Sequence, residues 1–147
     1  KMVKVHVTDT VPAPADTVWQ TLYDFGGLEK LLPDMIESCV VEGQGLGATR
    51  DIVLKDGGTA FETMSKLDEA GKTFNYTLDR STLPLENYEA TVKVSDLGGD
   101  KCQIDWSSEF DGVGMSEAES VEFATGLYQT IIDALNKALG ASSAAAE

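Results

Sequence analysis

Apolar and polar residues alternate along most of the chain, and this period of two is typical of half-buried β-strands. The alternation begins at residues 3–8 and resumes between Met35 and Phe110. Turn signals interrupt it at residues 43–45, 56–58, 69–71 and 97–100, with a less regular break at Leu83-Pro84. The sequence therefore predicts a first strand and, after residue 35, six further strands in an antiparallel meander.

The last long segment has a different period. Apolar residues recur there every three or four positions, which predicts one amphipathic helix over Ser116–Leu139. Ser116 and Glu119 form a capping-box pattern at its start, and Gly140 is a stop signal. The apolar stripe consists of Ala124, Leu127, Tyr128, Ile131, Leu135 and Ala138. We expect a sheet of comparable span to cover this stripe.

Two shorter helices are predicted between the first strand and the meander. Pro14 suits the first turn of a helix that ends at Gly26-Gly27, and a second helix covers Leu28–Leu32 before Pro33. This order of elements predicts an α+β fold in which a curved seven-stranded antiparallel sheet wraps around the long helix. A curled sheet of this kind is expected to leave an internal hydrophobic cavity beside the helix.

Length and charge limit the architecture and the partners. A chain of 147 residues with 42% hydrophobic residues supports one domain, which we place at residues 1–140, followed by a flexible C-terminal tail at residues 141–147. Asp and Glu number 25 against 11 Lys and Arg, which gives a net charge of −14 and disfavours nucleic acid and membranes as partners. We expect a monomer or weak dimer whose partner is a small hydrophobic molecule.

Other chemistries find little support in the sequence. His6 is the only histidine and lies on the polar side of the first strand, which argues against histidine triads and histidine metal sites. The glycines of residues 43–47 lie between two strands and open no helix, so they do not form a nucleotide-binding loop. Cys39 and Cys102 have no metal-ligand spacing and are expected to be buried thiols in a reducing, cytoplasmic environment. We expect no cofactor and no metal.

The informative residues are polar ones in the apolar register of the sheet. Arg50 shares a face with Ile52, so alternation directs its guanidinium inward, where it requires an anionic partner. A three-residue loop at residues 56–58 would place Ile52 opposite Glu62 and Arg50 opposite Met64, which makes Arg50 and Glu62 diagonal neighbours on the inward face. A two-residue turn would instead turn Glu62 to solvent.

This ion pair has two interpretations. It could merely fix the register of the sheet, but a buried pair costs several kcal/mol of desolvation for each ion. We favour a role in function, because polar groups in an apolar pocket orient ligands. Tyr88 is directed inward as a core aromatic or a pocket residue, and Arg80 follows the inward register as a rim residue. The expected ligand contacts are Arg50, Glu62, Tyr76, Tyr88, Trp106, Phe123, Leu127, Tyr128 and Ile131. For Trp106 and Phe123 a core role is the simplest interpretation.

Several local strings suggest a family. They are residues 12–19, which lead to Leu22 and Phe25, residues 47–50, Glu62 followed by Leu67-Asp68, Asn87-Tyr88 and the long last helix. In this order they are similar to the SRPBCC or START-like superfamily of helix-grip proteins, and within it to the polyketide cyclase/dehydrase-like branch. The resemblance covers nearly the whole chain and implies a helix-grip fold around a ligand cavity.

Within that superfamily the chain resembles plant abscisic acid receptors and the lachrymatory factor synthase. Arg50 and Glu62 stand where the synthase has the arginine and glutamate of its proton transfer, and Tyr88 falls near a position where that family uses tyrosine. The receptor lysine that anchors the hormone is Glu37 here and the receptor gate is not kept at residues 56–59, so hormone reception is not implied. The receptors carry the same arginine and glutamate, so the resemblance leaves binding and catalysis open.

Three functions therefore remain as hypotheses. The first is binding of a small, largely hydrophobic organic molecule between the last helix and the sheet, with Arg50 and Glu62 as the polar pair. The second is a cofactor-independent cyclase, lyase or isomerase in which Glu62 transfers a proton, Arg50 positions it and stabilises negative charge, and Tyr88 assists. The third is a stress or scaffold protein that acts through its acidic surface and has a fully packed interior.

Overall fold

A computed structural model of the chain describes residues 2–140. The elements are β1 (Met2–Val11), α1 (Ala15–Tyr23), α2 (Leu28–Leu31), β2 (Ile36–Glu42), β3 (Thr49–Leu54), β4 (Thr59–Asp68), β5 (Thr73–Ser81), β6 (Leu85–Gly98), β7 (Lys101–Gly112), α3 (Glu117–Leu135) and a π-helical turn η1 (Asn136–Gly140). This is the predicted order. The expected tail at residues 141–147 lies outside the described residues.

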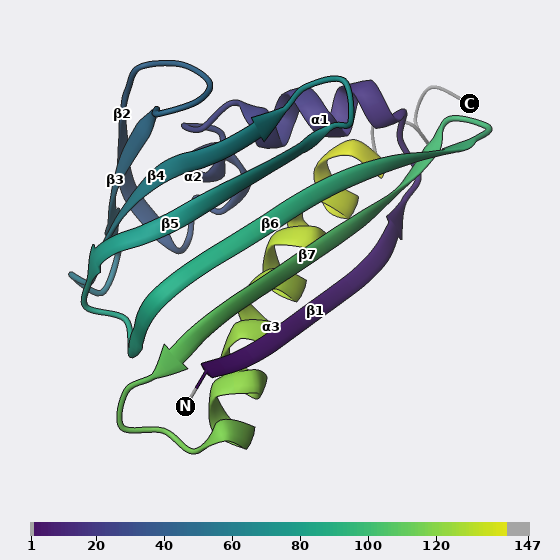
Figure 1. The fold of residues 1–147 in the computed structure, drawn as a ribbon. Coiled ribbons are helices and arrows are strands. Elements are labelled where there is room, and N and C mark those ends of the chain that lie inside the picture. The colour runs from purple at the N-terminus through teal and green to yellow at the C-terminus, as the bar shows by residue number, and fades with distance from the viewer. Residues whose placement is uncertain (1, 141–147) are drawn as a thin grey trace.

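The strands form one antiparallel sheet of seven strands in the order β1-β7-β6-β5-β4-β3-β2. The meander runs from β2 to β7 through consecutive neighbours, and β1 completes the sheet beside β7. Figure 1 shows the sheet curving around α3, with α1 and α2 at one end of the molecule. The predicted seven-stranded, curved antiparallel sheet around a long helix is confirmed.

The start of α3 follows the predicted capping box. The Ser116 hydroxyl oxygen accepts from the Glu119 backbone N–H at 3.1 Å, and the Glu119 carboxylate accepts from the Ser116 backbone N–H at 2.9 Å. The helical segment ends at Gly140, at the predicted stop, but only its part up to Leu135 is α-helical and the π-helical turn η1 follows it. At this point the Asn136 side-chain amide donates to the Ile132 carbonyl at 3.2 Å and competes with the backbone bonds of the last turn.

The position of α3 determines where the interior stays open. The helix packs mainly against β1 and β7, where its buried residues meet the apolar face of the sheet. The short helix α2 contacts both α3 and β2 and lies at one end of the curved sheet (Figure 1). Because α3 lies over one half of the sheet only, space remains between it and the strands of the other half.

Candidate functional site

An internal cavity of about 370 Å³ lies between α3, α2 and the inward face of the sheet. Its volume is within the range of about 300–1,000 Å³ that is usual for small-molecule sites. The lining is mostly Leu, Ile and Met side chains, with few polar groups. The residues that line it are Leu28, Leu32, Met35, Ile36, Arg50, Ile52, Leu54, Asp56, Ala60, Glu62, Tyr76, Leu78, Leu83, Leu85, Tyr88, Phe123, Gly126, Leu127, Thr130 and Ile131.

The β3–β4 hairpin carries the charged groups of the cavity, in a register that differs from the prediction. Arg50 lies directly opposite Glu62, so the predicted diagonal pairing is wrong by two residues. The loop does have three residues, but it begins one position earlier, because the Leu54 N–H donates to the Gly58 carbonyl at 2.8 Å. Gly57 takes the positive φ of this loop, at +92°. The parity of the hairpin is unchanged, so both charged side chains still face inward.

Arg50 and Glu62 form a buried ion pair. The Arg50 Nε donates to the Glu62 Oε1 at 2.6 Å, and the two side chains are 3% and 11% exposed. Arg50 Nη1 also donates to the Phe25 carbonyl at 3.4 Å, and the guanidinium carbon lies 4.0 Å from the centre of the Phe25 ring. The guanidinium is thus held by a carboxylate, a carbonyl and an aromatic face.

One side of this ion pair is open to the cavity. Within residues 2–140, no fully buried side-chain nitrogen or oxygen lacks a hydrogen-bond partner. Arg50 Nη2 and Glu62 Oε2 make no hydrogen bond to the described residues, so neither atom is fully covered. Both residues line the cavity, which is the open space beside them. A ligand can therefore meet one donor and one acceptor at this end.

A row of paired residues connects the ion pair to a tyrosine. Arg50 is opposite Glu62, Glu62 is opposite Leu78, and Leu78 is opposite Tyr88. The row crosses β3, β4, β5 and β6, and each of its residues lines the cavity. The three residues predicted to do chemistry, Arg50, Glu62 and Tyr88, therefore share one line across the cavity floor.

Hydrogen bonds link Tyr88 to a chain of hydroxyl groups, which we call the tyrosine chain. The Trp106 indole N–H donates to the Tyr76 hydroxyl at 3.1 Å, and the Tyr76 and Tyr88 hydroxyls lie 3.2 Å apart. The Tyr88 and Tyr128 hydroxyls lie 2.5 Å apart, and Tyr128 donates to the Ser108 hydroxyl at 2.6 Å. The chain begins at Trp106 and ends at Ser108, both on β7, and its two middle members Tyr76 and Tyr88 line the cavity.

Burial keeps these tyrosines protonated. It raises the pKa values of Tyr76 and Tyr88 well above their ordinary value, and it raises the pKa of Tyr128 to about 12. At neutral pH the three hydroxyls are therefore neutral hydrogen-bonding groups. They are not general bases.

The structure brings most of the expected contacts to the cavity, but not Trp106 and Tyr128. These two rings stack on each other at 5.5 Å between centroids, beneath α3, and neither lines the cavity. Trp106 is 2% exposed and Tyr128 is 0% exposed, and both lie behind the cavity wall, where they hydrogen-bond to the lining residues Tyr76 and Tyr88. The sequence placed them on the inward face correctly, but it could not indicate how deep they lie.

Arg80 also lies elsewhere than predicted. A bulge shifts the register between Phe61 and Glu62, so Arg80 pairs with Phe61 while Leu78 pairs with Glu62. The bulge turns Arg80 to the outer face, where its guanidinium carbon lies 4.0 Å from the centre of the Phe61 ring. Arg80 is therefore not a rim residue of the cavity.

Sequence reasoning missed part of the site. Leu28, Leu32, Met35 and Ile36 form one wall, but they lie in the short helix α2, at its C-cap, in the following turn and at the start of β2, and so share no period from which an inward face could be predicted. Ser108, which ends the tyrosine chain, did leave a signal. It is a hydroxyl in the inward register of β7, where its neighbours on the same face are apolar.

The cysteines differ slightly from expectation. Cys102 is buried, but Cys39 is only half-buried, and its thiol donates to the Phe25 carbonyl at 3.7 Å. Cys39 is less covered because β2 is the edge strand of the sheet. Burial raises the pKa of both thiols, which makes them poor nucleophiles at neutral pH.

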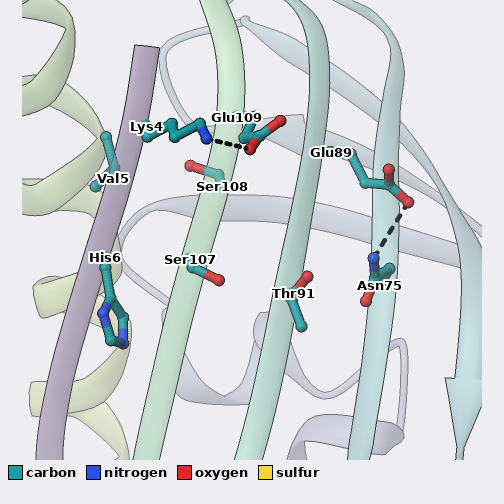
Figure 2. A pocket seen from close by; sticks show the side chains of 9 residues that line it. All are labelled: Lys4, Val5, His6, Asn75, Glu89, Thr91, Ser107, Ser108 and Glu109. Atoms are coloured by element: carbon teal, nitrogen blue, oxygen red, sulfur yellow. Dashed lines mark hydrogen bonds and ion pairs between the residues drawn. The ribbon is translucent and has the colours of Figure 1, made fainter.

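A second hollow, of about 480 Å³, lies on the outer face of the sheet, over β1, β7, β6 and β5 (Figure 2). Its polar side chains pair with one another: Lys4 Nζ lies 3.4 Å from Glu109 Oε1, and Asn75 donates to Glu89 at 3.2 Å. His6, at its edge, is exposed as predicted and lies 2.9 Å from Asp105. This open polar surface lacks the apolar lining that a hydrophobic ligand requires.

Comparison with known proteins identifies the family. The family model described as polyketide cyclase/dehydrase and lipid transport matches residues 2–140. The chain belongs to this family. The match confirms the resemblance to the polyketide cyclase-like branch of the helix-grip superfamily, and it supports ligand binding or cyclase-like chemistry in a cavity at the level of the family.

Solved structures with the family's fold agree. XoxI from Bacillus cereus is 22% identical, with a TM-score of 0.83 over 93% of this chain and 95% of that chain. A protein from Thermobifida fusca is 23% identical, with a TM-score of 0.77 over 93% of both chains. Norcoclaurine synthase from Thalictrum flavum, in complex with dopamine and hydroxybenzaldehyde, is 25% identical, with a TM-score of 0.74 over 93% of this chain and 86% of that chain. A search of curated protein sequences gave no match.

Across residues 2–140, no helix is both long enough and apolar enough to cross a bilayer.

Proposed function

We propose that the chain binds a small, largely hydrophobic organic molecule in the cavity between α3 and the sheet, with Arg50 and Glu62 at its polar end. The observation that carries this proposal is the buried ion pair on the wall of an otherwise apolar cavity of about 370 Å³. Apolar walls favour a hydrophobic body, and the few polar groups fix its orientation.

The ion pair itself favours a ligand over a purely structural role. Removing two charges from water costs several kcal/mol for each ion, and apolar residues of similar volume often stabilise a fold equally well. A pair that only held β3 and β4 in register would gain nothing from an open side. Arg50 and Glu62 both line the cavity, where a bound molecule can contact them.

The similar structures support the same class of molecule. Norcoclaurine synthase was solved with dopamine and hydroxybenzaldehyde, both small aromatic compounds. An aromatic ring suits the leucine- and isoleucine-rich walls of the present cavity. The scaffold hypothesis requires a fully packed interior, and the cavity argues against it.

Binding can be tested with the apolar fluorescent probe N-phenyl-1-naphthylamine. We expect its emission to rise in the presence of the protein. Leu127→Trp fills the cavity from α3, and we expect it to weaken binding at least about tenfold. The matched control is Val121→Trp on the same helix, at a position that is 37% exposed and does not line the cavity. Equal binding by both variants, or no binding by the parent protein, would contradict the proposal.

Catalysis is a second candidate function, favoured by the position of Glu62. A carboxylate beside an arginine, on the wall of a mostly apolar cavity, can remove and return a proton while the guanidinium stabilises developing negative charge. In this role Glu62 transfers the proton, Arg50 positions it, and Tyr88 assists through its hydroxyl. The chemistry corresponds to a cofactor-independent isomerase, lyase or cyclase.

Proton transfer can be measured before the natural substrate is identified. The probe is 2-tetralone, a hydrophobic ketone with acidic C–H groups next to its carbonyl, incubated with the protein in deuterium oxide. We expect incorporation of deuterium above the buffer rate, measured by NMR, and loss of this excess in Glu62→Gln. Exchange that persists in Glu62→Gln and in Arg50→Ala would remove both residues from the proposed role.

A further inference from the structure

The direction of the hydrogen bonds between the tyrosines follows from the bond at the Ser108 end of the chain. An indole N–H can only donate, so Tyr76 accepts from Trp106. At the other end, Tyr128 donates its one hydrogen to Ser108. Tyr128 therefore has to accept from Tyr88, and Tyr88, whose hydrogen is then used, has to accept from Tyr76. All the hydrogens point from Trp106 toward Ser108.

This direction determines what Tyr76 and Tyr88 can offer to a ligand. Both residues line the cavity, but both hydroxyl hydrogens are already committed to the next residue of the chain. Neither hydroxyl therefore has a hydrogen left for a bound molecule, and a ligand group that reaches either oxygen meets a lone pair. The site combines these acceptors with the open Oε2 of Glu62, which is also an acceptor in the ion pair.

Among residues 2–140, the Arg50 guanidinium is the one open donor on the cavity wall, because the Thr130 hydroxyl, which also lines the cavity, donates to the Gly126 carbonyl at 2.8 Å. Arg50 Nη2 is not fully covered, whereas Nε and Nη1 are bonded to Glu62 and to the Phe25 carbonyl. An ether or ketone can accept a hydrogen bond from Arg50, but it has no hydrogen to donate to the acceptors of Tyr76, Tyr88 and Glu62. A ligand carboxylate is repelled by the negative charge of Glu62, and a ligand ammonium is repelled by the positive charge of Arg50. A neutral hydroxyl can accept from Arg50 and donate to an acceptor at once.

From this arrangement we infer that the natural ligand or substrate carries a neutral hydroxyl group, an alcohol or a phenol, as its polar end. Tyr128 and Ser108 act as specificity-determining positions, because they fix the direction of the tyrosine chain without touching the ligand. This inference rests on the proposed function, since it requires that the cavity bind a hydrophobic molecule.

The preference can be measured with three probes that share one ring system: 2-naphthol, 2-methoxynaphthalene and 2-naphthoate. We expect 2-naphthol to bind most tightly by isothermal titration calorimetry. Methylation removes the donor and leaves buried acceptors unpaired, which corresponds to about a tenfold loss of affinity. The carboxylate is expected to bind at least as weakly as the ether, because it adds a negative charge beside Glu62.

Two variants test the direction of the chain. Tyr128→Phe keeps the ring that stacks on Trp106 but removes the hydroxyl that accepts from Tyr88, so the Tyr88 hydrogen becomes available to a ligand. Ser108→Ala removes the acceptor of the Tyr128 hydrogen, so Tyr128 can donate to Tyr88 instead. The Tyr88 hydrogen then becomes available to a ligand in this variant also. In both variants we expect the naphthol-to-ether affinity ratio to fall from about ten toward one. Tyr23→Phe, outside the chain, is the control.

The outcomes separate this inference from the proposed function. Tighter binding of 2-naphthol, with a ratio that falls in Tyr128→Phe and in Ser108→Ala but not in Tyr23→Phe, supports the inference. Equal affinity for the hydroxyl and ether probes overturns the hydroxyl preference and leaves cavity binding intact. A preference that neither chain variant changes overturns the role assigned to Tyr128 and Ser108. Absence of binding by all three naphthalenes overturns the proposed function and the inference together.

Discussion

Replacement of the Arg50–Glu62 pair by apolar residues separates a structural role from a functional one. The set consists of Arg50→Met, Glu62→Leu and the double variant. Each single change leaves the other charge buried without its partner, whereas the double change removes both charges and restores an apolar wall. Breaking a buried pair is strongly destabilising, but its complete apolar replacement is often neutral.

The structure gives the size of each effect. Loss of one partner of a buried pair costs about 3–5 kcal/mol, and Arg50→Met also loses the contact of the guanidinium with the Phe25 ring, which adds about 0.5–2 kcal/mol. The 11% exposure of Glu62 places both values toward the lower end. We expect about 4 kcal/mol for Arg50→Met, a fall in Tm of about 8–16 °C, and about 3 kcal/mol for Glu62→Leu.

Urea denaturation of the four proteins measures the coupling energy between the two positions. We expect the double variant to lie within about 1 kcal/mol of the parent protein, which with single losses of about 4 and 3 kcal/mol gives a coupling of about 6 kcal/mol. The exposed pair Lys4 and Glu109, 3.4 Å apart on the outer face, is the control and should show less than about 1 kcal/mol. Additive losses at Arg50 and Glu62 would refute the reasoning. A stable double variant that no longer binds 2-naphthol would assign the pair to the ligand.

Three further predictions concern the rest of the fold. Ser116→Ala removes the capping hydroxyl of α3 and should lower the free energy of unfolding by about 1 kcal/mol in urea titrations. The raised pKa of Tyr128 stabilises the folded protein below pH 10, the unfolded pKa, and this contribution of up to about 3 kcal/mol is lost as the pH rises toward 12. In a Tyr23→Phe background, which removes the one tyrosine outside the chain, absorbance at 295 nm should therefore rise together with the loss of circular dichroism, and tyrosine ionisation near pH 10 in this folded variant would contradict the prediction. Gly126→Ala, whose added Cβ meets no atom within 4 Å, should stabilise α3 by about 0.5–1 kcal/mol, whereas Gly112→Ala should destabilise because its Cβ would clash with the Ser120 hydroxyl.

Alternation predicted the strands and faces of the sheet but not its exact pairing. A period of two gives the side of the sheet on which Arg50 and Glu62 lie, and both were placed inward correctly. The offset between their strands depends on where the loop begins, and this is set by local bonds: the Gly58 N–H donates to the Asp56 carboxylate at 2.8 Å, and the Leu54 N–H donates to the Gly58 carbonyl. Several offsets share the same parity, so the pattern alone could not select one.

The alternation of apolar and polar residues also could not predict how deep an inward-facing side chain lies in the interior. Tyr88 and Trp106 both occupy inward positions, yet Tyr88 lines the cavity and Trp106 does not. The difference arises from α3, which lies against β1 and β7 and covers the face of Trp106, while the floor formed by β3 to β6 stays open. The bulge that turns Arg80 outward was hidden for a similar reason, because it depends on pairing with the neighbouring strand.

The binding and catalytic hypotheses are linked by the acceptors at the polar end of the cavity. The enol of a ketone carries a hydroxyl donor that the ketone itself lacks. A site whose tyrosines and Glu62 offer lone pairs, with Arg50 as the one open donor among residues 2–140, therefore favours the enol over the ketone. Glu62 lies beside the same space and is the group proposed to move the proton that interconverts the two forms. If the hydroxyl preference disappears in Tyr128→Phe, the excess deuterium exchange of 2-tetralone should fall with it, although Glu62 is unchanged. Exchange that stayed constant would show that the tyrosine chain controls binding alone.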